Sequence, residues 1–557
     1  MKNRLLPALM LIVMLVSLAG SASASQTEAI ALLQVFIPDS HAVQRFAATG
    51  LPAYLSKDGF LLTGASASRQ GLLDAAGLET QMLDADLRGA QYYLAYLRAS
   101  QTAPAWDEYG RLLLAGENYA LLRSTPEAAT RLGAVVRGMR AITLTPKPLP
   151  DLDAQADSFP EVVIPDPFVQ GIIDQVTESE IYALTAGLSG VNPVTIGGEP
   201  YTILTRHTYS GEPIQKATQY VGEYLGDLGL LVEYHTWDLE SPPNVIGKLP
   251  GLVTPRDIYI IGGHLDDMPS YIYSPIAPGA DDNASGSVAT MLAAEIFSQY
   301  YWGCTLRFAF WTGEEQGLLG SYEYAERSRL QKETILGYLN LDMIAWNSDN
   351  RPGIDLYATD DIPATVELAQ LFSDVIEAYQ INLDVDIFDN DMGASDHASF
   401  WDFNYVAILA IEDDNDFNVN YHTVNDTLAN LDMEYYTNFV KATLATFAHM
   451  SGCMLPTGSL DGTVSDAGSA APIPGASLVF TDALGHNFNA AADDSGYYTF
   501  VLPSGTYTVT ASAQGYLPAT ITGVSIVTDT LTTQDIQLSL VPESYVIYMP
   551  MSLKNGE

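Results

Sequence analysis

The sequence predicts a central α/β domain whose mostly parallel sheet is covered by helices on both faces. Short apolar runs with the length and β-branched or aromatic content of buried strands occur at Ile258 to Ile261, Leu306 to Trp311 and Leu336 to Leu341. Helical patterns lie between them, at Ser285 to Tyr300 and Gln316 to Arg329. In such sheets ligands bind beyond the carboxyl ends of the strands, so polar residues that directly follow these runs are the first candidates for a site.

Ahead of this domain, residues 25–150 predict a small α/β unit. The stretches GFLLTGASASRQGLLDAAGLETQML and NYALLRSTPEAATRLGAVVRGMRAITL each run from a short strand through a polar turn into a helix and then another apolar run. A linker rich in Pro and Asp, residues 151–166, separates this unit from the central domain at 167–456. Because such linkers are exposed and easily nicked, we expect residues 25–150 to be a propeptide or folding aid, with a permanent accessory domain as the alternative.

After Leu455 the composition shifts toward Gly, Ser, Thr and Val, and apolar and polar residues alternate between closely spaced turns. This pattern predicts an antiparallel β-sandwich over residues 457–541, followed by a tail at 542–557. The D-G-x-V opening and the D-x-x-G-x-Y-x-F hairpin resemble the carboxypeptidase regulatory-like, transthyretin-type modules of secreted enzymes. No catalytic pattern is visible in it, which leaves stability, spacing or cell-surface attachment as its role.

The first 24 residues predict a secretory signal peptide. Lys2 and Arg4 precede the apolar run Leu5 to Leu18, and Ala22-Ser23-Ala24 forms a small-residue cleavage site. No later segment has the uninterrupted apolar length that a spanning helix needs. We therefore expect a secreted or extracytoplasmic protein without a membrane span.

Charge is distributed unevenly along the chain. Residues 26–150 carry 11 basic and 11 acidic side chains, whereas the residues after 150 carry 11 basic and 56 acidic ones. Such a surface repels nucleic acid and favours solubility. The acidic run Glu412 to Asp416 offers oxygen ligands for calcium, but it matches no calcium-loop template and is interpreted as an ordinary loop.

Two cysteines, Cys304 and Cys453, are the complete set. In an exported protein they form either a single disulfide or two buried thiols, and two cysteines alone give no pattern that decides between these.

Five potential metal ligands and one further carboxylate follow the predicted strands. In chain order they are His264, Asp282, Glu314, Glu315, Asp342 and His422. Imidazole nitrogen and carboxylate oxygen are ordinary zinc ligands, and two metals roughly 3.5–4 Å apart need a shared carboxylate between them. The set therefore predicts a two-zinc hydrolase site, with other divalent metals as alternatives.

The strings that hold these residues, among them GGHLDD, GADDNASGS, FWTGEEQG, LNLDM and YHTVNDT, resemble the co-catalytic zinc peptidases that include secreted bacterial leucine aminopeptidases and, more distantly, glutamate carboxypeptidases. The resemblance covers roughly residues 167–455 and implies the zinc aminopeptidase fold. It also implies that His264 and Asp342 bind one metal, that Glu315 and His422 bind the other, and that Asp282 bridges them.

The same resemblance implies roles for three further groups. Glu314 is the general base that deprotonates a water shared by the metals, and Asp266 is the carboxylate that orients the imidazole of His264. The substrate's free α-amine is bound by Glu314 and Asp342. Some members carry a tyrosine where this chain has Met392, but others place it directly before the last histidine, so Tyr421 takes the oxyanion role.

The resulting hypothesis is an exported aminopeptidase acting on peptides with a free N-terminus. A carboxypeptidase or another amidohydrolase on the same scaffold is the second hypothesis, and a non-catalytic binding relative is the third. A carboxypeptidase needs an arginine for the terminal carboxylate of its substrate, and no motif in the sequence places one.

Overall fold

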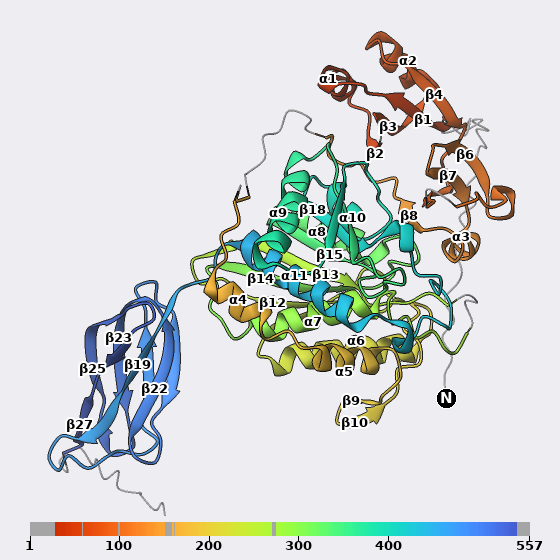
Figure 1. The fold of residues 1–557 in the computed structure, drawn as a ribbon. Helices are drawn as coiled ribbons and strands as arrows, with labels where there is room; N and C mark the ends of the chain where they lie inside the picture. The colour runs from red at the N-terminus through yellow and green to blue at the C-terminus, as the bar shows by residue number, and fades with distance from the viewer. Residues whose placement is uncertain are drawn as a thin grey trace, which may run out of the picture.

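The computed structural model describes residues 28–57, 59–98, 101–150, 159–160, 162–269 and 274–542 (Figure 1). The expected signal peptide at 1–24 and all but the first residue of the expected tail lie outside these ranges. Three bodies are visible along the chain: an N-terminal region, a large central body, and an elongated β-sandwich that extends away from the central body on a narrow connection (Figure 1).

The central body is built on one eight-stranded sheet in the order β11-β12-β14-β13-β15-β18-β16-β17. Its strands are β11 (Leu231–His235), β12 (Asn244–Leu249), β13 (Thr254–His264), β14 (Cys304–Trp311), β15 (Thr334–Leu341), β16 (Gly353–Tyr357), β17 (Asp384–Phe388) and β18 (Ala407–Glu412). The three strands predicted from the sequence lie within β13, β14 and β15, and these pair in parallel with one another and with β18. Antiparallel pairs occur only toward the edges, at β11–β12, β12–β14 and β16–β18.

Helices cover both faces of this sheet, as the sequence predicts. One face is covered by α4 (Pro167–Ile173), α5 (Glu178–Leu188), α6 (Glu212–Asp227), α7 (Ala284–Phe297), α9 (Pro363–Tyr379) and α11 (Met433–Ser451). The other face is covered by α8 (Leu319–Gln331) and α10 (His397–Trp401). The aromatic rings of Trp311, Tyr338 and Phe400 form the core beneath these two helices.

The N-terminal region contains two four-stranded antiparallel sheets with strand orders β2-β3-β1-β4 and β6-β7-β5-β8. Its elements are β1 (Ile30–Phe36), α1 (Ser40–Ala48), β2 (Ala53–Lys57), β3 (Phe60–Ser66), α2 (Ala67–Ala75), β4 (Thr80–Asp84), β5 (Gln91–Tyr96), β6 (Arg111–Ala115), β7 (Tyr119–Ser124), α3 (Pro126–Gly133) and β8 (Gly138–Ile142). The two similar stretches of the sequence form β3-α2-β4 and β7-α3-β8. Each is a strand, a helix and a second strand.

The C-terminal β-sandwich packs two sheets around a common core that includes Leu460, Phe480 and Tyr498. One sheet has the order β22-β19-β27-β24, with β26 paired to β19, and the other has the order β21-β20-β23-β25. The strands are β19 (Thr457–Asp466), β20 (Ser477–Thr481), β21 (Asn487–Ala491), β22 (Tyr497–Pro503), β23 (Gly505–Ser512), β24 (Tyr516–Leu517), β25 (Ala519–Ile526), β26 (Leu531–Thr533) and β27 (Ile536–Leu540).

Cys304 and Cys453 form a disulfide that joins the start of β14 to the chain just after α11. The structure thereby decides between the two states that the sequence left open. Within the described ranges, no helix has the length and apolar character needed to cross a membrane.

Candidate functional site

The six predicted site residues meet at the carboxyl end of the parallel strands. His264 is the last residue of β13, Asp342 directly follows β15, and the Glu314–Glu315 pair follows β14 by three and four residues. Asp282 lies just before α7, whose first turn is capped by the side chain of Asn283. His422 comes from the connection between β18 and α11. All six side chains are buried.

Asp282 stands between two separate pairs of side chains. One carboxylate oxygen, Oδ1, lies 3.3 Å from Nε2 of His264, whereas Oδ2 lies 3.1 Å from Nε2 of His422. His264 Nε2 is in turn 3.2 Å from Asp342, and His422 Nε2 is 3.0 Å from Glu315. The result is two three-residue clusters that share one carboxylate.

The ring of His264 is held in one tautomer. Its Nδ1 lies 3.0 Å from the backbone carbonyl of Asp266, which only accepts hydrogen bonds, so Nδ1 carries the proton. Nε2, the nitrogen left to bind a metal, then faces Asp282 and Asp342. The orienting group is thus the carbonyl of Asp266, because its carboxylate stands 3.8 Å from Nδ1. That carboxylate instead accepts hydrogen bonds from the Thr208 hydroxyl at 2.7 Å and the Glu314 amide at 3.4 Å.

One carboxylate oxygen of the cluster, Oε1 of Glu315, is buried without a hydrogen-bond partner among the described residues. Buried carboxylates are costly unless a cation or a donor compensates them. Burial and the charge of Asp282 raise the pKa of Glu315 to about 7, although His422 opposes this shift. Carboxylate and imidazole atoms in this arrangement are a donor set that fits zinc.

Glu314 does not belong to either of the two clusters that share Asp282, but it lies within reach of His264 and Glu315. Burial raises the pKa of its carboxyl well above the usual value, and the neighbouring carboxylates of Glu315, Asp396 and Asp342 add to that shift against the opposing effect of His264. A carboxyl group whose pKa is raised in this way is suited to accept and return a proton near neutral pH.

Tyr421 lies against the second cluster, with its ring stacked on the imidazole of His422 at a centroid distance of 3.6 Å. Burial and the charges of Asp282 and Glu315 raise the pKa of its phenol well above the usual value, so the hydroxyl stays a donor. It donates a 2.6 Å hydrogen bond to the backbone carbonyl of Arg137, which belongs to the N-terminal region.

Asp426 is a supporting residue that sequence reasoning missed. Its carboxylate accepts hydrogen bonds from the backbone amides of Asp281 and Asp282 at 3.0 Å each, and it lies four residues after His422. Asp281 extends the same support, because its carboxylate accepts from the Ala345 amide and from the Asn418 side chain. The signal was present in YHTVNDT, the string that supplied His422, but nothing in the sequence shows which backbone amides an aspartate faces.

The cavity above the clusters is small and is closed partly by the N-terminal region. It measures about 20 Å³, which leaves room for a water molecule but not for a peptide. Apolar side chains on its wall are Met343, Leu409, Ile411 and Phe417, and the N-terminal region contributes Gly133, Arg137, Gly138 and Met139. No sequence signal indicated these last four residues, because only tertiary packing brings them to the site.

Comparison with known proteins adds two matches along the chain. Residues 244–447 match the model of Peptidase family M28, and residues 459–539 match that of the carboxypeptidase regulatory-like domain. A probable aminopeptidase of Saccharomyces cerevisiae is 30% identical over 218 residues, which is 37% of this chain and 57% of the yeast protein. A probable leucine aminopeptidase of Trichophyton verrucosum is 30% identical over 216 residues, which is 36% of this chain and 55% of that protein. The chain therefore spans a little over half the length of these two relatives.

Two solved structures share the fold. The LapA aminopeptidase of Legionella pneumophila aligns with a TM-score of 0.51 at 18% identity, covering 65% of this chain and 98% of its own. LapB from the same organism aligns with a TM-score of 0.50 at 16% identity, covering 65% of this chain and 99% of its own.

Proposed function

We propose that this chain, whose residues 244–447 belong to peptidase family M28, is an exported aminopeptidase that removes the first residue of peptides with the help of two zinc ions. The observation that carries the proposal is the position of Asp282, whose two oxygens each face a different histidine. The similarity to fungal proteins that are named leucine aminopeptidases supports the same reaction.

The residues divide naturally between the two ions. His264 and Asp342 would hold one, Glu315 and His422 would hold the other, and Asp282 would bind both. When bound, such a pair of ions polarises the scissile carbonyl and lowers the pKa of the attacking water. The buried Oε1 of Glu315, which has no hydrogen-bond partner among the described residues, is an atom that such an ion would compensate.

Glu314 would carry the proton through the reaction. Its carboxylate takes a proton from the attacking water and returns it to the departing amine, as general acid–base catalysis requires. The Asp266 carboxylate accepts a hydrogen bond from the Glu314 amide, so it helps to fix the backbone that presents this group. Tyr421 would donate its hydroxyl to the oxygen of the scissile carbonyl, the kind of group to which it donates in the structure.

The free amine of the substrate is the feature that separates an aminopeptidase from other amidohydrolases. We place this ammonium group between Glu314 and Asp342, both of which line the cavity. A carboxypeptidase would instead need an arginine for the substrate's terminal carboxylate. Among the described lining residues the only arginine is Arg137, which comes from the N-terminal region and is paired with Asp414.

Export and attachment are further parts of the proposal. The N-terminal sequence has the order of a secretory signal peptide, and the Cys304–Cys453 disulfide suits an oxidising compartment. We propose that the β-sandwich serves as a spacer or as a means of attachment to the cell surface. Its narrow connection to the central body is consistent with such a role (Figure 1).

The test is hydrolysis of leucine p-nitroanilide beside its N-acetylated analogue, measured on intact protein and on protein cut within residues 151–158. We expect cleavage of the free amine only, loss of that activity with a chelator, and about two zinc ions per chain by elemental analysis. Equal cleavage of both substrates would replace the aminopeptidase with a general amidohydrolase. Activity that survives complete metal removal would overturn the zinc mechanism.

A further inference from the structure

The N-terminal region approaches the candidate active site with its backbone. The turn from α3 into β8 passes directly over the ligand clusters, and the carbonyl of Arg137 accepts the hydrogen bond of Tyr421 at 2.6 Å. On the proposed mechanism, this hydroxyl serves the carbonyl of the substrate's scissile bond. The backbone carbonyl of Arg137 therefore occupies the Tyr421 hydroxyl, which a substrate carbonyl would need as its hydrogen-bond donor.

The fit around this turn is close. A Cβ atom added to Gly138 would lie 2.5 Å from the carbonyl oxygen of Ala394, so only glycine allows the two backbones to approach so near. Ala141 then donates its amide to the carbonyl of Gly317, just beyond the Glu314–Glu315 pair. With this segment in place the cavity retains only about 20 Å³.

The contact continues as a shared apolar core. One cluster of buried side chains includes Leu55, Tyr92 and Tyr96 of the N-terminal region together with Met343 and Phe417 of the central body. Met343 directly follows Asp342, so the N-terminal region covers apolar surface that adjoins the predicted ligands. A substrate side chain placed beside the clusters would need this same surface.

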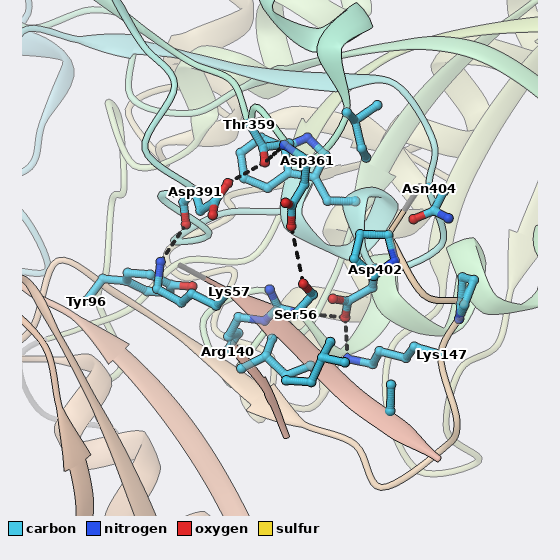
Figure 2. Close-up of a pocket in the computed structure, with 17 residues that line it drawn as sticks. Ser56, Lys57, Tyr96, Arg140, Lys147, Thr359, Asp361, Asp391, Asp402 and Asn404 are labelled. Atoms are coloured by element: carbon cyan, nitrogen blue, oxygen red, sulfur yellow. Dashed lines mark hydrogen bonds and ion pairs between the residues drawn. The ribbon is translucent and has the colours of Figure 1, made fainter. Parts of the chain in front are cut away.

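Ion pairs hold the outer part of the contact, around a second cavity of about 50 Å³ (Figure 2). Asp402 of the central body pairs with both Arg140 and Lys147, the latter at 2.5 Å. Lys57 donates to the backbone carbonyl of Asp391 at 3.1 Å. Figure 2 shows Lys57, Arg140 and Lys147 of the N-terminal region reaching toward Asp391 and Asp402 of the central body.

Four cationic side chains of the N-terminal region are buried in its contact with the central body. Lys57, Arg137, Arg140 and Lys147 are each less than one-tenth exposed. Lysine and arginine are almost never buried so deeply unless they are paired. The neutral N-terminal region thus directs four cations at a strongly acidic partner, which indicates a surface built for this contact.

We propose that residues 28–147 form an autoinhibitory domain that closes the active site, and that the chain becomes active when this domain is displaced or removed. This inference rests on the proposed peptidase function, because it states that the N-terminal region competes with the peptide substrate for the active site. The acidic rim and the apolar wall of the site are, on this view, a docking surface for the chain's own N-terminal region.

The first experiment uses the full chain with a site-specific protease sequence inserted within residues 151–158. Activity on leucine p-nitroanilide is compared for the intact chain, the cut chain, and the central body after separation from the N-terminal fragment. We expect the separated body to be at least tenfold more active than the intact chain. Equal activity of the intact and separated forms would overturn autoinhibition and leave the proposed function in place.

A second readout does not depend on turnover. The rate at which a chelator strips zinc is measured on the same three samples. We expect metal loss at least tenfold faster from the separated body, because its site is no longer covered. If no sample cleaves the substrate, the proposed peptidase function fails. The chelation rates still test whether the N-terminal region closes the site: faster zinc loss from the separated body supports closure, and equal rates overturn it.

Point variants in the uncut chain cover the case in which the separated body loses its fold. Gly138→Ala inserts a methyl group against Ala394, whereas Gly71→Ala, in α2, adds the same group where no atom lies within 4 Å. We expect Gly138→Ala to raise activity and zinc release severalfold and Gly71→Ala to change neither. Asp402→Asn should act like Gly138→Ala in the intact chain and have no effect in the separated body. Wild-type values for both variants in the intact chain would overturn the proposal.

Discussion

Asp426 accepts a 3.0 Å hydrogen bond from the backbone amide of Asp282. Asp282, which faces both histidines, is therefore held in place by the same loop that carries His422. The carboxylate also accepts from the amide of Asp281. The position of the shared carboxylate and the position of His422 are therefore coupled through one short stretch of chain.

We predict that Asp426→Asn weakens zinc binding by roughly 10- to 100-fold, the usual effect of losing a group that orients a ligand. The new amide presents one acceptor where two backbone N–H groups need acceptors. Competition with a chromogenic chelator measures the affinity. Asp432→Ala is the control, because it removes the N-cap carboxylate of α11 and should cost about 1 kcal/mol of stability without altering zinc affinity.

Glu314→Gln should keep both metals and lower kcat by roughly 100- to 10,000-fold, because the variant cannot transfer the proton. Steady-state kinetics on the separated central body, with zinc content measured in parallel, checks this expectation. Glu323→Gln, an exposed change on α8, serves as the matched control. Full activity in Glu314→Gln would assign the base to another group.

Tyr421→Phe should lower kcat by roughly 100- to 1000-fold with a smaller change in KM, as for the loss of one oxyanion donor. The measurement again requires the separated body, because in the intact chain the change also removes the hydrogen bond to Arg137. Tyr435→Phe is a suitable control, since it deletes a phenol that donates to the carbonyl of Gly353 outside the site. Equal kcat values for the two variants would remove Tyr421 from the mechanism.

Replacing Cys304 and Cys453 with serine should lower the free energy of unfolding by about 2–5 kcal/mol, because the disulfide restricts a long loop in the unfolded chain. The two sulfurs lie away from the ligand clusters, so kcat at low temperature should not change. Denaturant titration of the wild type with and without reductant, beside the double variant, tests both statements. An unchanged midpoint on reduction would contradict them.

Acid stability should depend on Glu233. Burial raises the pKa of its carboxyl, but hydrogen bonds and charge from Lys248 and Arg327 outweigh that effect and lower the pKa to about 2. A carboxyl with a depressed folded pKa contributes stability above its unfolded value near 4.5 and loses it as the pH falls toward 2. Glu233→Gln should therefore reduce stability at pH 7 and show a shallower loss between pH 4.5 and 2 in thermal scans. If the melting temperature falls equally with pH in the wild type and in Glu233→Gln, Glu233 does not cause the acid sensitivity.

The sequence predicted the parallel centre of the sheet and the meeting of the ligands well, because both depend on local patterns. The runs in β13, β14 and β15 are mostly apolar, although Arg307 interrupts the second and Asn340 the third. His264, Glu315 and Asp342 lie at the ends of these strands or shortly beyond them. The antiparallel edge strands carried no comparable signal. Strand direction at an edge depends on how the connections cross the sheet. A short apolar run has the same pattern in a parallel and in an antiparallel strand.

Two kinds of detail could not be predicted from the sequence: which atom of a nearby residue faces a side chain, and which distant segments pack together. The carboxylate of Asp266 was expected to orient the His264 ring, and it does lie 3.8 Å from Nδ1, but the backbone carbonyl of the same residue stands nearer, at 3.0 Å. Both groups lie two residues from the ring, so spacing cannot distinguish them. The closure by Arg137 and Gly138 likewise depends on packing between segments more than 250 residues apart.

The three central strands each carry a predicted metal ligand at the strand's end or within four residues beyond it. On the proposed function, zinc content is therefore a sensitive assay of correct folding. A slip of one residue in any strand would displace its ligand by about 3.3 Å and turn alternate side chains to the other face. Such a molecule would still contain a nearly complete sheet and would look native by circular dichroism. It would nevertheless hold too few ligands in place, so the ratio of metal to protein measures the correctly registered fraction of a preparation.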